Sequence, residues 1–153
     1  MNKPSSNLYI ASDHRGYQLK KRLLRYFENE LKTPVTDMGP TEYVETDDYP
    51  DYAVPLAKKV AKQKKSRGIL ICGSANGVCI TANKIRGIRA AIGYNITSAE
   101  AAMADLDTNI LCLSAKLSTD EHAMAIVKKW LETSFGGEER HERRIKKISE
   151  LEK

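Results

Sequence analysis

Two kinds of segment alternate along the chain. Short runs rich in β-branched and other apolar residues occupy residues 7–12, 34–38, 68–72, 90–94 and 109–113, and longer stretches between them carry an apolar residue every three or four positions. The short runs are typical of strands, and the longer spacing is typical of amphipathic helices. Such alternation predicts an α/β fold, a Rossmann-like three-layer sandwich in which a five-stranded parallel sheet has helices on both faces.

The first helices are expected between the strands. Apolar stripes from Leu19 to Leu31 and from Ala53 to Ala61 mark two of them, and Pro50 fits the first turn of the second. Shorter helices should follow Gly77 and Thr97.

The remaining segments predict a loop and two more helices. Residues 39–48 are acidic and without periodicity, which indicates a surface loop. A helix should start at a candidate capping box, residues 118–121, and stop at the glycine pair 136–137. A basic C-terminal helix should run from Glu139 to Leu151. The helix that starts at the capping box should bury Met124, Val127, Trp130 and Leu131.

Polar residues stand where three of the predicted strands end. Asp13 and His14 follow the first strand, residues 72–77 follow the third, and residues 114–116 follow the fifth. In open parallel sheets, ligands bind outside the carboxyl ends of the strands, near a switch in strand order. These residues are therefore the first candidates for a site.

The segment from Cys72 to Gly77 offers the clearest chemistry. Two glycines between a strand and a helix let backbone N–H groups converge on an anion, and the helix dipole adds positive potential. The same glycines could simply make a tight turn, since neither a Walker loop nor a G-x-G-x-x-G motif occurs here. Cys72 stands where a thiol can become a base or nucleophile, although most buried cysteines are inert. Cys79 and Cys112 lie in apolar stretches and are assigned to the core.

Length and composition favour a single domain, residues 1–153. With 41% hydrophobic residues, the 153-residue chain can bury one core but not two. The N-terminal residues do not resemble a secretory signal, and no segment reaches the roughly 18 apolar residues of a membrane span. The three cysteines lack C-x-x-C spacing, which indicates free thiols in a reducing compartment. We therefore expect a soluble, cytoplasmic protein without a membrane partner.

Charge and histidine spacing narrow the range of ligands. The net charge is +5, and its densest cluster is the basic segment 140–147. Such a cluster fits nucleic acid, a solvated helix face or a pocket for one small anion. The sequence lacks aromatic interleaving and nucleic-acid motifs, which argues against nucleic acid. The three histidines share no ligand spacing, which argues against a metal.

Several ordered motifs carry a resemblance to a known family. The chain resembles the type B ribose-5-phosphate isomerases and their relatives that isomerise hexose phosphates, including the subunits of galactose-6-phosphate isomerase. The similarity covers nearly the whole chain, and several motifs in order are more specific than any one of them. The matching segments are residues 69–77, 12–16, 48–50, 82–84, 87–90, 107–109 and 140–141 with Arg144.

The resemblance implies an aldose–ketose isomerase that uses neither a metal nor an organic cofactor and works through an enediolate. Cys72 aligns with the base that moves a proton between neighbouring carbons. The backbone amides of residues 73–77 align with the loop that receives the developing oxyanion. Ser74 matches a hydroxyl position that could assist the proton transfer.

The same resemblance implies the groups that hold the substrate. Asp13 and His14 are expected at the sugar and its phosphate, and Arg140 and Arg144 on the phosphate, where guanidinium groups bind in bidentate fashion. Lys116 stands where the family commonly has an arginine. The positive charge is therefore kept, but the guanidinium group that can bind phosphate in bidentate fashion is lost. The expected substrate-binding residues are Asp13, His14, Tyr49, Gly73, Ala75, Asn76, Gly77, Lys116, Arg140 and Arg144.

The chain departs from the family pattern just before Asp107. The family has a histidine there, which opens the sugar ring, followed by an asparagine that touches the substrate. This chain has Asp105 and Leu106 instead. An ordinary aspartate is ionised at neutral pH, so it can accept a proton from the ring hydroxyl but holds none to donate.

Three hypotheses follow from this departure. The protein isomerises ribose 5-phosphate with Asp105 or another group opening the ring, or it takes an acyclic tetrose 4-phosphate or a hexose 6-phosphate, or it is a non-catalytic sugar-phosphate-binding subunit. The retained Cys72 and arginines favour an enzyme. The resemblance also implies a homodimer, or a tetramer of two such dimers, with each site built at the subunit interface.

Overall fold

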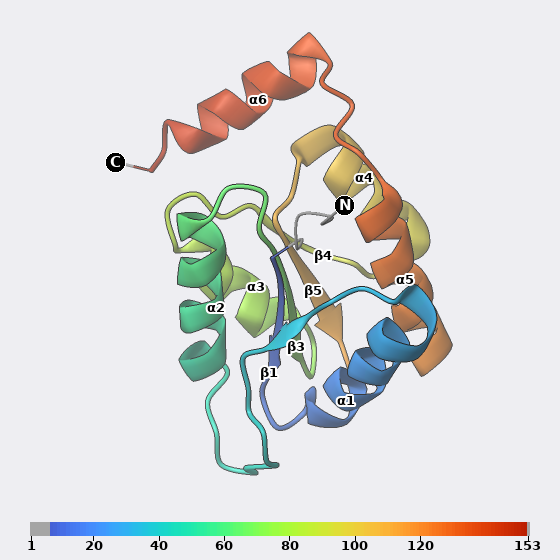
Figure 1. Cartoon of the computed structure of the whole chain (residues 1–153). Coiled ribbons are helices and arrows are strands. Elements are labelled where there is room, and N and C mark those ends of the chain that lie inside the picture. Colours follow the sequence, from blue (N-terminus) through green and yellow to red (C-terminus); the bar gives the residue numbers. More distant parts are fainter. Residues whose placement is uncertain (1–6, 153) are drawn as a thin grey trace.

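The computed structural model describes residues 7–152 and confirms the predicted parallel sheet (Figure 1). Its strands are β1 (Leu8–Ser12), β2 (Thr36–Asp37), β3 (Arg67–Cys72), β4 (Ala90–Ile92) and β5 (Ile110–Ser114). Every pair of neighbours is parallel, and the order across the sheet is β2-β1-β3-β5-β4. The carboxyl ends of the strands therefore share one edge, at the bottom of Figure 1.

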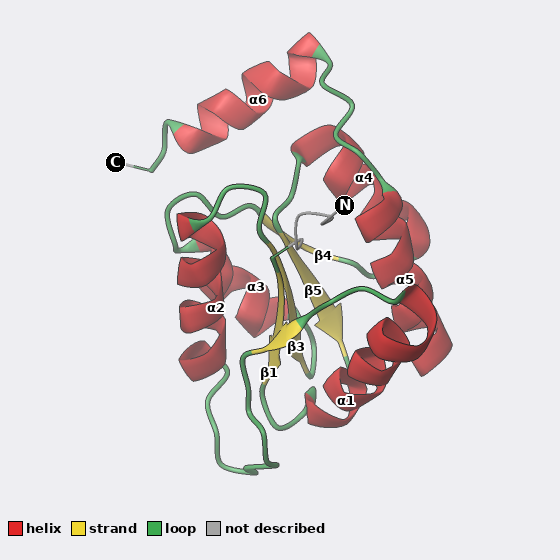
Figure 2. Ribbon diagram, viewed as in Figure 1, coloured by secondary structure: helices red, strands yellow, loops and turns green. Residues whose placement is uncertain are grey.

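Helices form the two outer layers of the sandwich (Figure 2). They are α1 (Tyr17–Tyr26), which continues as the π-helical segment η1 (Phe27–Leu31), α2 (Pro50–Lys62), α3 (Asn76–Asn83), α4 (Ile96–Leu106), α5 (Asp120–Glu132) and α6 (Glu139–Ser149). The α2 and α3 helices cover one face, and α1, α4 and α5 cover the other. The α6 helix lies beyond the amino ends of the strands, at the top of Figure 1. Within residues 7–152, every helix is too short or too polar to cross a bilayer.

The β3 strand shows how the sheet divides the core. Ile69 and Ile71 pack with α1, α4 and α5, whereas Leu70 and Cys72 pack with α2 and α3. This alternation follows from the two-residue period of a strand. Since both faces are covered, the strand is apolar along most of its length, which is typical of parallel sheets. Cys72 therefore ends the strand with its side chain on the α2 and α3 side.

The edge strands are shorter than the sequence predicts. The apolar run 34–38 forms a strand only at Thr36–Asp37, and the run 90–94 only at Ala90–Ile92. Pro34 has no N–H to donate to a neighbouring strand. β4 is short because the chain soon turns into α4. The Asn95 side chain caps that helix by accepting a hydrogen bond from the Ser98 N–H at 2.7 Å.

The ends of two helices also differ from the prediction. The α5 helix is capped by Thr119, whose hydroxyl accepts from the His122 N–H at 3.2 Å, and not by Ser118. It ends at Glu132, before the glycine pair 136–137. It buries Ala123 and Ile126, which were not predicted to be buried, whereas Met124 and Leu131, which were, are only partly buried. The α6 helix ends at Ser149, two residues before Leu151.

Gly16 is predicted to be essential for stability. A Cβ at this position would lie 2.6 Å from the Ile71 carbonyl oxygen, which belongs to the backbone of β3 and cannot move aside. We expect Gly16→Ala to lower the free energy of unfolding by about 1–3 kcal/mol, measured by urea denaturation. Gly73→Ala is the matched control, because its Cβ would meet the flexible Arg15 side chain at 2.9 Å. Equal losses in both variants would contradict the prediction.

Candidate active site

The carboxyl ends of β1 and β3 lie side by side where the strand order switches. The chain passes from β1 to β2 on one side, while β3 lies on the other side of β1. Asp13 follows β1, and its N–H donates to the Ile71 carbonyl oxygen at 3.2 Å, one residue before Cys72. The structure thus brings Asp13 and Cys72 together at the position where open parallel sheets bind ligands.

Hydrogen bonds from the loop after β5 hold the segment from Cys72 to Gly77. The Gly73 carbonyl oxygen accepts from the Ser114 hydroxyl at 2.7 Å and from the Lys116 N–H at 3.0 Å. The Cys72 carbonyl oxygen accepts from the Ala115 N–H at 3.0 Å. These bonds place Lys116, a predicted substrate-binding residue, beside the loop and fix the backbone of the loop.

The same segment leads into α3 through an unusual backbone conformation. Ala75, just before the helix, has a φ of 68°, and no side chain caps the helix start at Asn76. The Asn76 N–H donates a hydrogen bond to the Ser74 hydroxyl oxygen at 3.3 Å. A helix start without a side-chain cap offers backbone N–H groups to an anion, as the sequence predicts for this loop.

The Cys72 thiol is shielded from water. The residue is 3% exposed, and it belongs to the core cluster on the α2 and α3 side of the sheet, which also includes Ala75, Val78 and Cys112. All three cysteines are free thiols. Cys112 is fully buried and Cys79 is half-buried against the same cluster, which agrees with their assignment to the core.

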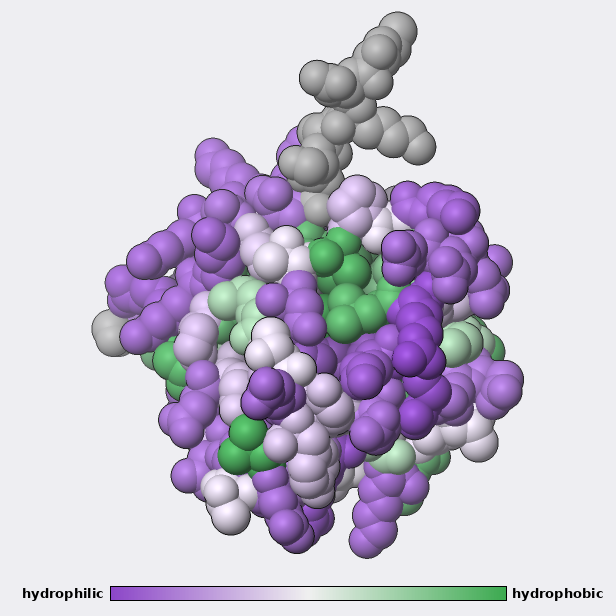
Figure 3. Space-filling model, turned by 60° about the horizontal axis from the view of Figure 1, so that its bottom comes forward, coloured by the Kyte–Doolittle hydropathy of each residue, from purple (hydrophilic) through white to green (hydrophobic). Residues whose placement is uncertain are grey.

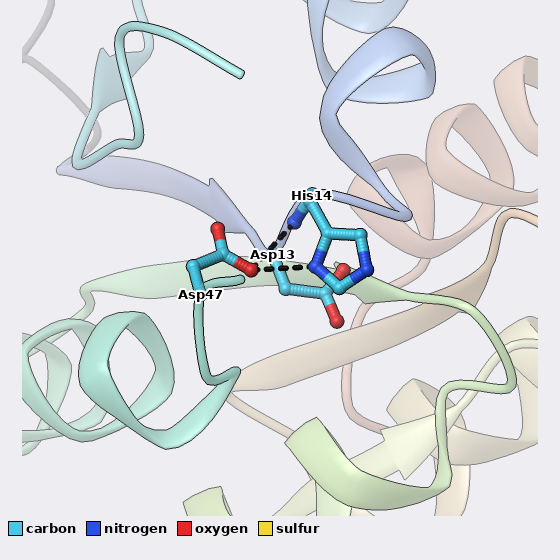
Figure 4. A group of neighbouring side chains, drawn as sticks. All are labelled: Asp13, His14 and Asp47. Carbon is cyan, nitrogen blue, oxygen red and sulfur yellow. Dashed lines mark hydrogen bonds and ion pairs between the residues drawn. The ribbon is translucent and has the colours of Figure 1, made fainter. Parts of the chain in front are cut away.

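Asp47 holds the imidazole of His14, as Figure 4 shows. The Asp47 Oδ1 atom lies 2.7 Å from His14 Nδ1 and accepts from the His14 N–H at 3.0 Å. The Asp47 side chain is only 5% exposed, so solvent competes little for this contact. An imidazole that donates from Nδ1 to a carboxylate keeps Nε2 available for a ligand.

The third member of this group is the Asp13 carboxyl. Burial raises the pKa of Asp13, and the negative charge of Asp47 raises it further, while the Gly16 N–H, donating at 3.0 Å, and the charge of His14 oppose the shift. A carboxyl with a raised pKa keeps its proton to higher pH than an exposed aspartate. Asp13 therefore places a partly desolvated carboxyl beside the start of the loop.

The two glycines of the loop each lie against a larger side chain. A Cβ on Gly77 would lie 2.6 Å from Cζ of Tyr49, and a Cβ on Gly73 would lie 2.9 Å from Cδ of Arg15. Tyr49 and Arg15 thus border the loop closely. Figure 3, which turns the lower side of the molecule forward, shows hydrophilic side chains over most of that side with a smaller hydrophobic area among them.

Asp13, His14 and Asp47 also contain the donor atoms that a metal would need. Within residues 7–152, they form one group whose ligand atoms all lie within 4.8 Å of one another. A cation bound by all three would have to replace the 2.7 Å contact between His14 Nδ1 and Asp47 Oδ1. As arranged, the group is a hydrogen-bonded histidine and carboxylate beside a second carboxyl.

The other predicted site residues lie at the opposite end of the sheet. Asp105 is in the last turn of α4, and Arg140 and Arg144 are on α6, beyond the amino ends of the strands. Asp105, Leu106 and Arg144 line one cavity of about 400 Å³. Arg140 is exposed and pairs with Glu138 at 2.9 Å. One copy of the chain does not bring these residues to Cys72.

Two residues near the loop were not singled out by sequence reasoning. Asp47 lies in the predicted surface loop 39–48, where its only signal is an acidic stretch without periodicity. Arg15 belongs to the motif Ser12 to Gly16, but nothing in that motif indicates that its side chain packs on Gly73. Both contacts join segments that are far apart in the sequence.

Comparison with known proteins identifies relatives over almost the entire chain. The chain is 43% identical to a probable ribose-5-phosphate isomerase B of Mycoplasma pneumoniae, over 100% of this chain and 97% of the relative. It is 32% identical to ribose-5-phosphate isomerase B of Mycobacterium tuberculosis (strain H37Rv), over 95% of this chain and 90% of the relative.

Solved structures agree with these relatives. Ribose-5-phosphate isomerase B from Mycoplasma genitalium with bound ribulose-5-phosphate superposes with a TM-score of 0.91 at 42% identity, covering 95% of each chain. The enzyme from Clostridium thermocellum gives 0.90 at 38% identity, covering 95% of this chain and 97% of the other. The family model described as ribose/galactose isomerase matches residues 8–148. The resemblance read from the motifs is confirmed, and the chain belongs to the ribose/galactose isomerase family.

Proposed function

We propose that this protein is an aldose–ketose isomerase that interconverts ribose 5-phosphate and ribulose 5-phosphate, with residues 1–153 acting as one isomerase domain. The observation that carries the proposal is the water-shielded Cys72 thiol at the start of an anion-binding loop, beside Asp13 at the switch point of the sheet. Relatives named as ribose-5-phosphate isomerase B support the same substrate.

In this proposal Cys72 acts as the base. The thiolate takes the proton from C2 of the open-chain aldose, the C–H electron pair forms the C1–C2 double bond, and the aldehyde oxygen becomes negative. Cys72 then returns the proton to C1, and the proton of the C2 hydroxyl passes to the negative oxygen on C1, which leaves C2 as the carbonyl carbon of the ketose. Backbone N–H groups of residues 73–77 stabilise the negative oxygen, an effect typically worth about 10²–10³ in rate per donor. Ser74 assists the proton transfer between the oxygens.

The neighbouring side chains position the sugar in this scheme. Asp13 forms a hydrogen bond with a sugar hydroxyl, and His14 Nε2 is offered to the sugar phosphate because Asp47 holds the other ring nitrogen. Tyr49 borders the loop at Gly77. Three free thiols fit a reducing compartment, so we place the enzyme in the cytoplasm.

We further propose that two copies of the chain share each site in a homodimer. The β3 strand has six residues, so the two ends of the sheet are separated by roughly 17 Å, much more than the length of a pentose phosphate. Asp105, Arg140 and Arg144 lie at the end opposite Cys72. A two-fold partner that offers its α6 helix to Cys72 would complete the site. The exposed Tyr94 and Ile96, which follow the carboxyl end of β4, fit such an interface.

A substrate panel tests the proposed activity. Purified protein is incubated with ribose 5-phosphate, a tetrose 4-phosphate, and allose and galactose 6-phosphates, and ketose formation is followed. We expect the highest kcat/KM for ribose 5-phosphate. Turnover of only the tetrose 4-phosphate would replace the pentose substrate by an acyclic one, and binding without turnover of any sugar would indicate a non-catalytic subunit.

A further inference from the structure

The α6 helix buries one side chain, and that side chain is a histidine. His141 is 8% exposed, while the other residues of α6 are exposed or half-buried. Its N–H donates to the Glu138 carbonyl oxygen at 2.9 Å, which fixes the start of the helix. A helix of this kind usually buries apolar residues, so a single buried imidazole requires a reason.

The imidazole faces two carboxylates. His141 Nε2 lies 3.7 Å from Asp105 Oδ1 and 3.9 Å from Glu138 Oε2. With Leu106 and Arg144, the His141 and Asp105 side chains line the cavity of about 400 Å³ between α4, β4 and α6. One cavity therefore holds an imidazole, a carboxylate and a guanidinium.

His141 also shares its helix with the two arginines expected on the phosphate. It follows Arg140 directly and precedes Arg144 by three residues. Along the helix axis it therefore lies within one turn of either arginine, and one turn rises roughly 5.4 Å. In ribose 5-phosphate the ring oxygen is bonded to C4, the neighbour of the carbon that carries the phosphate. A group close to the phosphate arginines is therefore close to the ring oxygen.

We propose that His141 and Asp105 together open the sugar ring, with His141 as the acid and Asp105 as the base; this rests on the proposed isomerase function. Protonated His141 gives a proton to the ring oxygen as the bond from that oxygen to C1 breaks. Asp105 takes the proton of the C1 hydroxyl, and C1 becomes the aldehyde carbon. The proton then passes from Asp105 to His141, which restores both groups.

Asp105 alone does not supply both functions. Its side chain is 51% exposed, and a carboxylate that accepts the proton of the C1 hydroxyl does not at the same time donate one to the ring oxygen. Leu106 contributes apolar surface only. The paired imidazole provides the missing donor, so the acid comes from α6 instead of the end of α4.

The test compares His141→Gln with wild type at increasing enzyme concentration on ribose 5-phosphate. Without an enzymatic acid, turnover should fall about 100-fold or more at low enzyme concentration, the usual range for general acid catalysis. At high concentration the rate should level off at the spontaneous ring-opening rate of the sugar, measured separately. The rate of wild type should continue to rise above that ceiling. Asp105→Asn should show the same ceiling.

His122→Gln is the matched control, because His122 is a half-buried histidine on α5 outside the proposed site. It should match wild type. Thermal melting and protection by inorganic phosphate show whether each variant is folded, and Asp105→Asn carries the test if His141→Gln does not fold. If the rates of both His141→Gln and Asp105→Asn rose with enzyme concentration above the spontaneous ring-opening rate, the proposal would be overturned. Absence of turnover by wild type would overturn the isomerase function itself.

Discussion

Replacing Cys72 with alanine is expected to lower the turnover of ribose 5-phosphate by about 10³-fold, within the usual range for loss of a general base. The thiol is the only group proposed to remove the C2 proton, and a methyl group cannot accept it. The fold should survive, because the side chain is small and the backbone of the loop is held by the Ser114 and Lys116 bonds to Gly73. Steady-state kinetics and thermal melting measure the two effects.

Cys79→Ala is the control for this substitution. Cys79 is a free, half-buried thiol on α3 that packs against the same cluster. It should keep nearly full activity. In Cys72→Ala, exchange of the substrate C2 proton with deuterated water should disappear together with turnover. Retention of turnover or of this exchange would show that another group is the base.

Mixing two inactive variants is expected to restore activity. One variant carries Cys72→Ala, and the other carries Arg140→Ala with Arg144→Ala. The arginine variant should lose about 10² or more in kcat/KM, since hydrogen bonds to charged groups contribute roughly 1.5–3 kcal/mol each. If each site takes Cys72 from one subunit and the arginines from the other, every mixed dimer has one intact site. A randomly assorted mixture should then have about a quarter of wild-type activity, and purified mixed dimers about half.

The experiment separates a shared site from one built within a single chain. If one chain supplied both Cys72 and the arginines, each site of a mixed dimer would be defective and mixing would restore nothing. Differently tagged variants are expressed together, the doubly tagged dimers are purified, and their activity is measured. Unmixed preparations of each variant serve as controls. A monomeric wild type with full activity would equally contradict the shared site.

Much of the fold could be predicted because it depends on local patterns. Apolar runs of strand length between helical stripes correspond to the five strands and six helices that the structure contains within residues 7–152. Element ends were less predictable, since the first residue of α5 depends on which hydroxyl accepts a hydrogen bond, and Thr119 does so in place of Ser118. The length of β2 likewise depends on pairing with β1 at an edge.

The site could be predicted only in part, for a physical reason. Cys72 and Asp13 stand at strand ends, and parallel pairing alone brings such ends together. The contact of Asp47 with His14 and that of His141 with Asp105 join segments 33 and 36 residues apart, through loops and helix ends without periodicity. Sequence patterns indicate which residues are available for chemistry, whereas tertiary packing decides which of them meet.

The bonds from Ser114 and Lys116 to Gly73 have a consequence for the cost of binding. A loop that becomes ordered only when its ligand arrives loses conformational entropy at that moment, which weakens affinity. Here the strand β5 and its following turn already hold the loop, so that entropy is lost during folding. Substrate affinity should therefore depend little on loop ordering, and the binding energy remains available for the transition state.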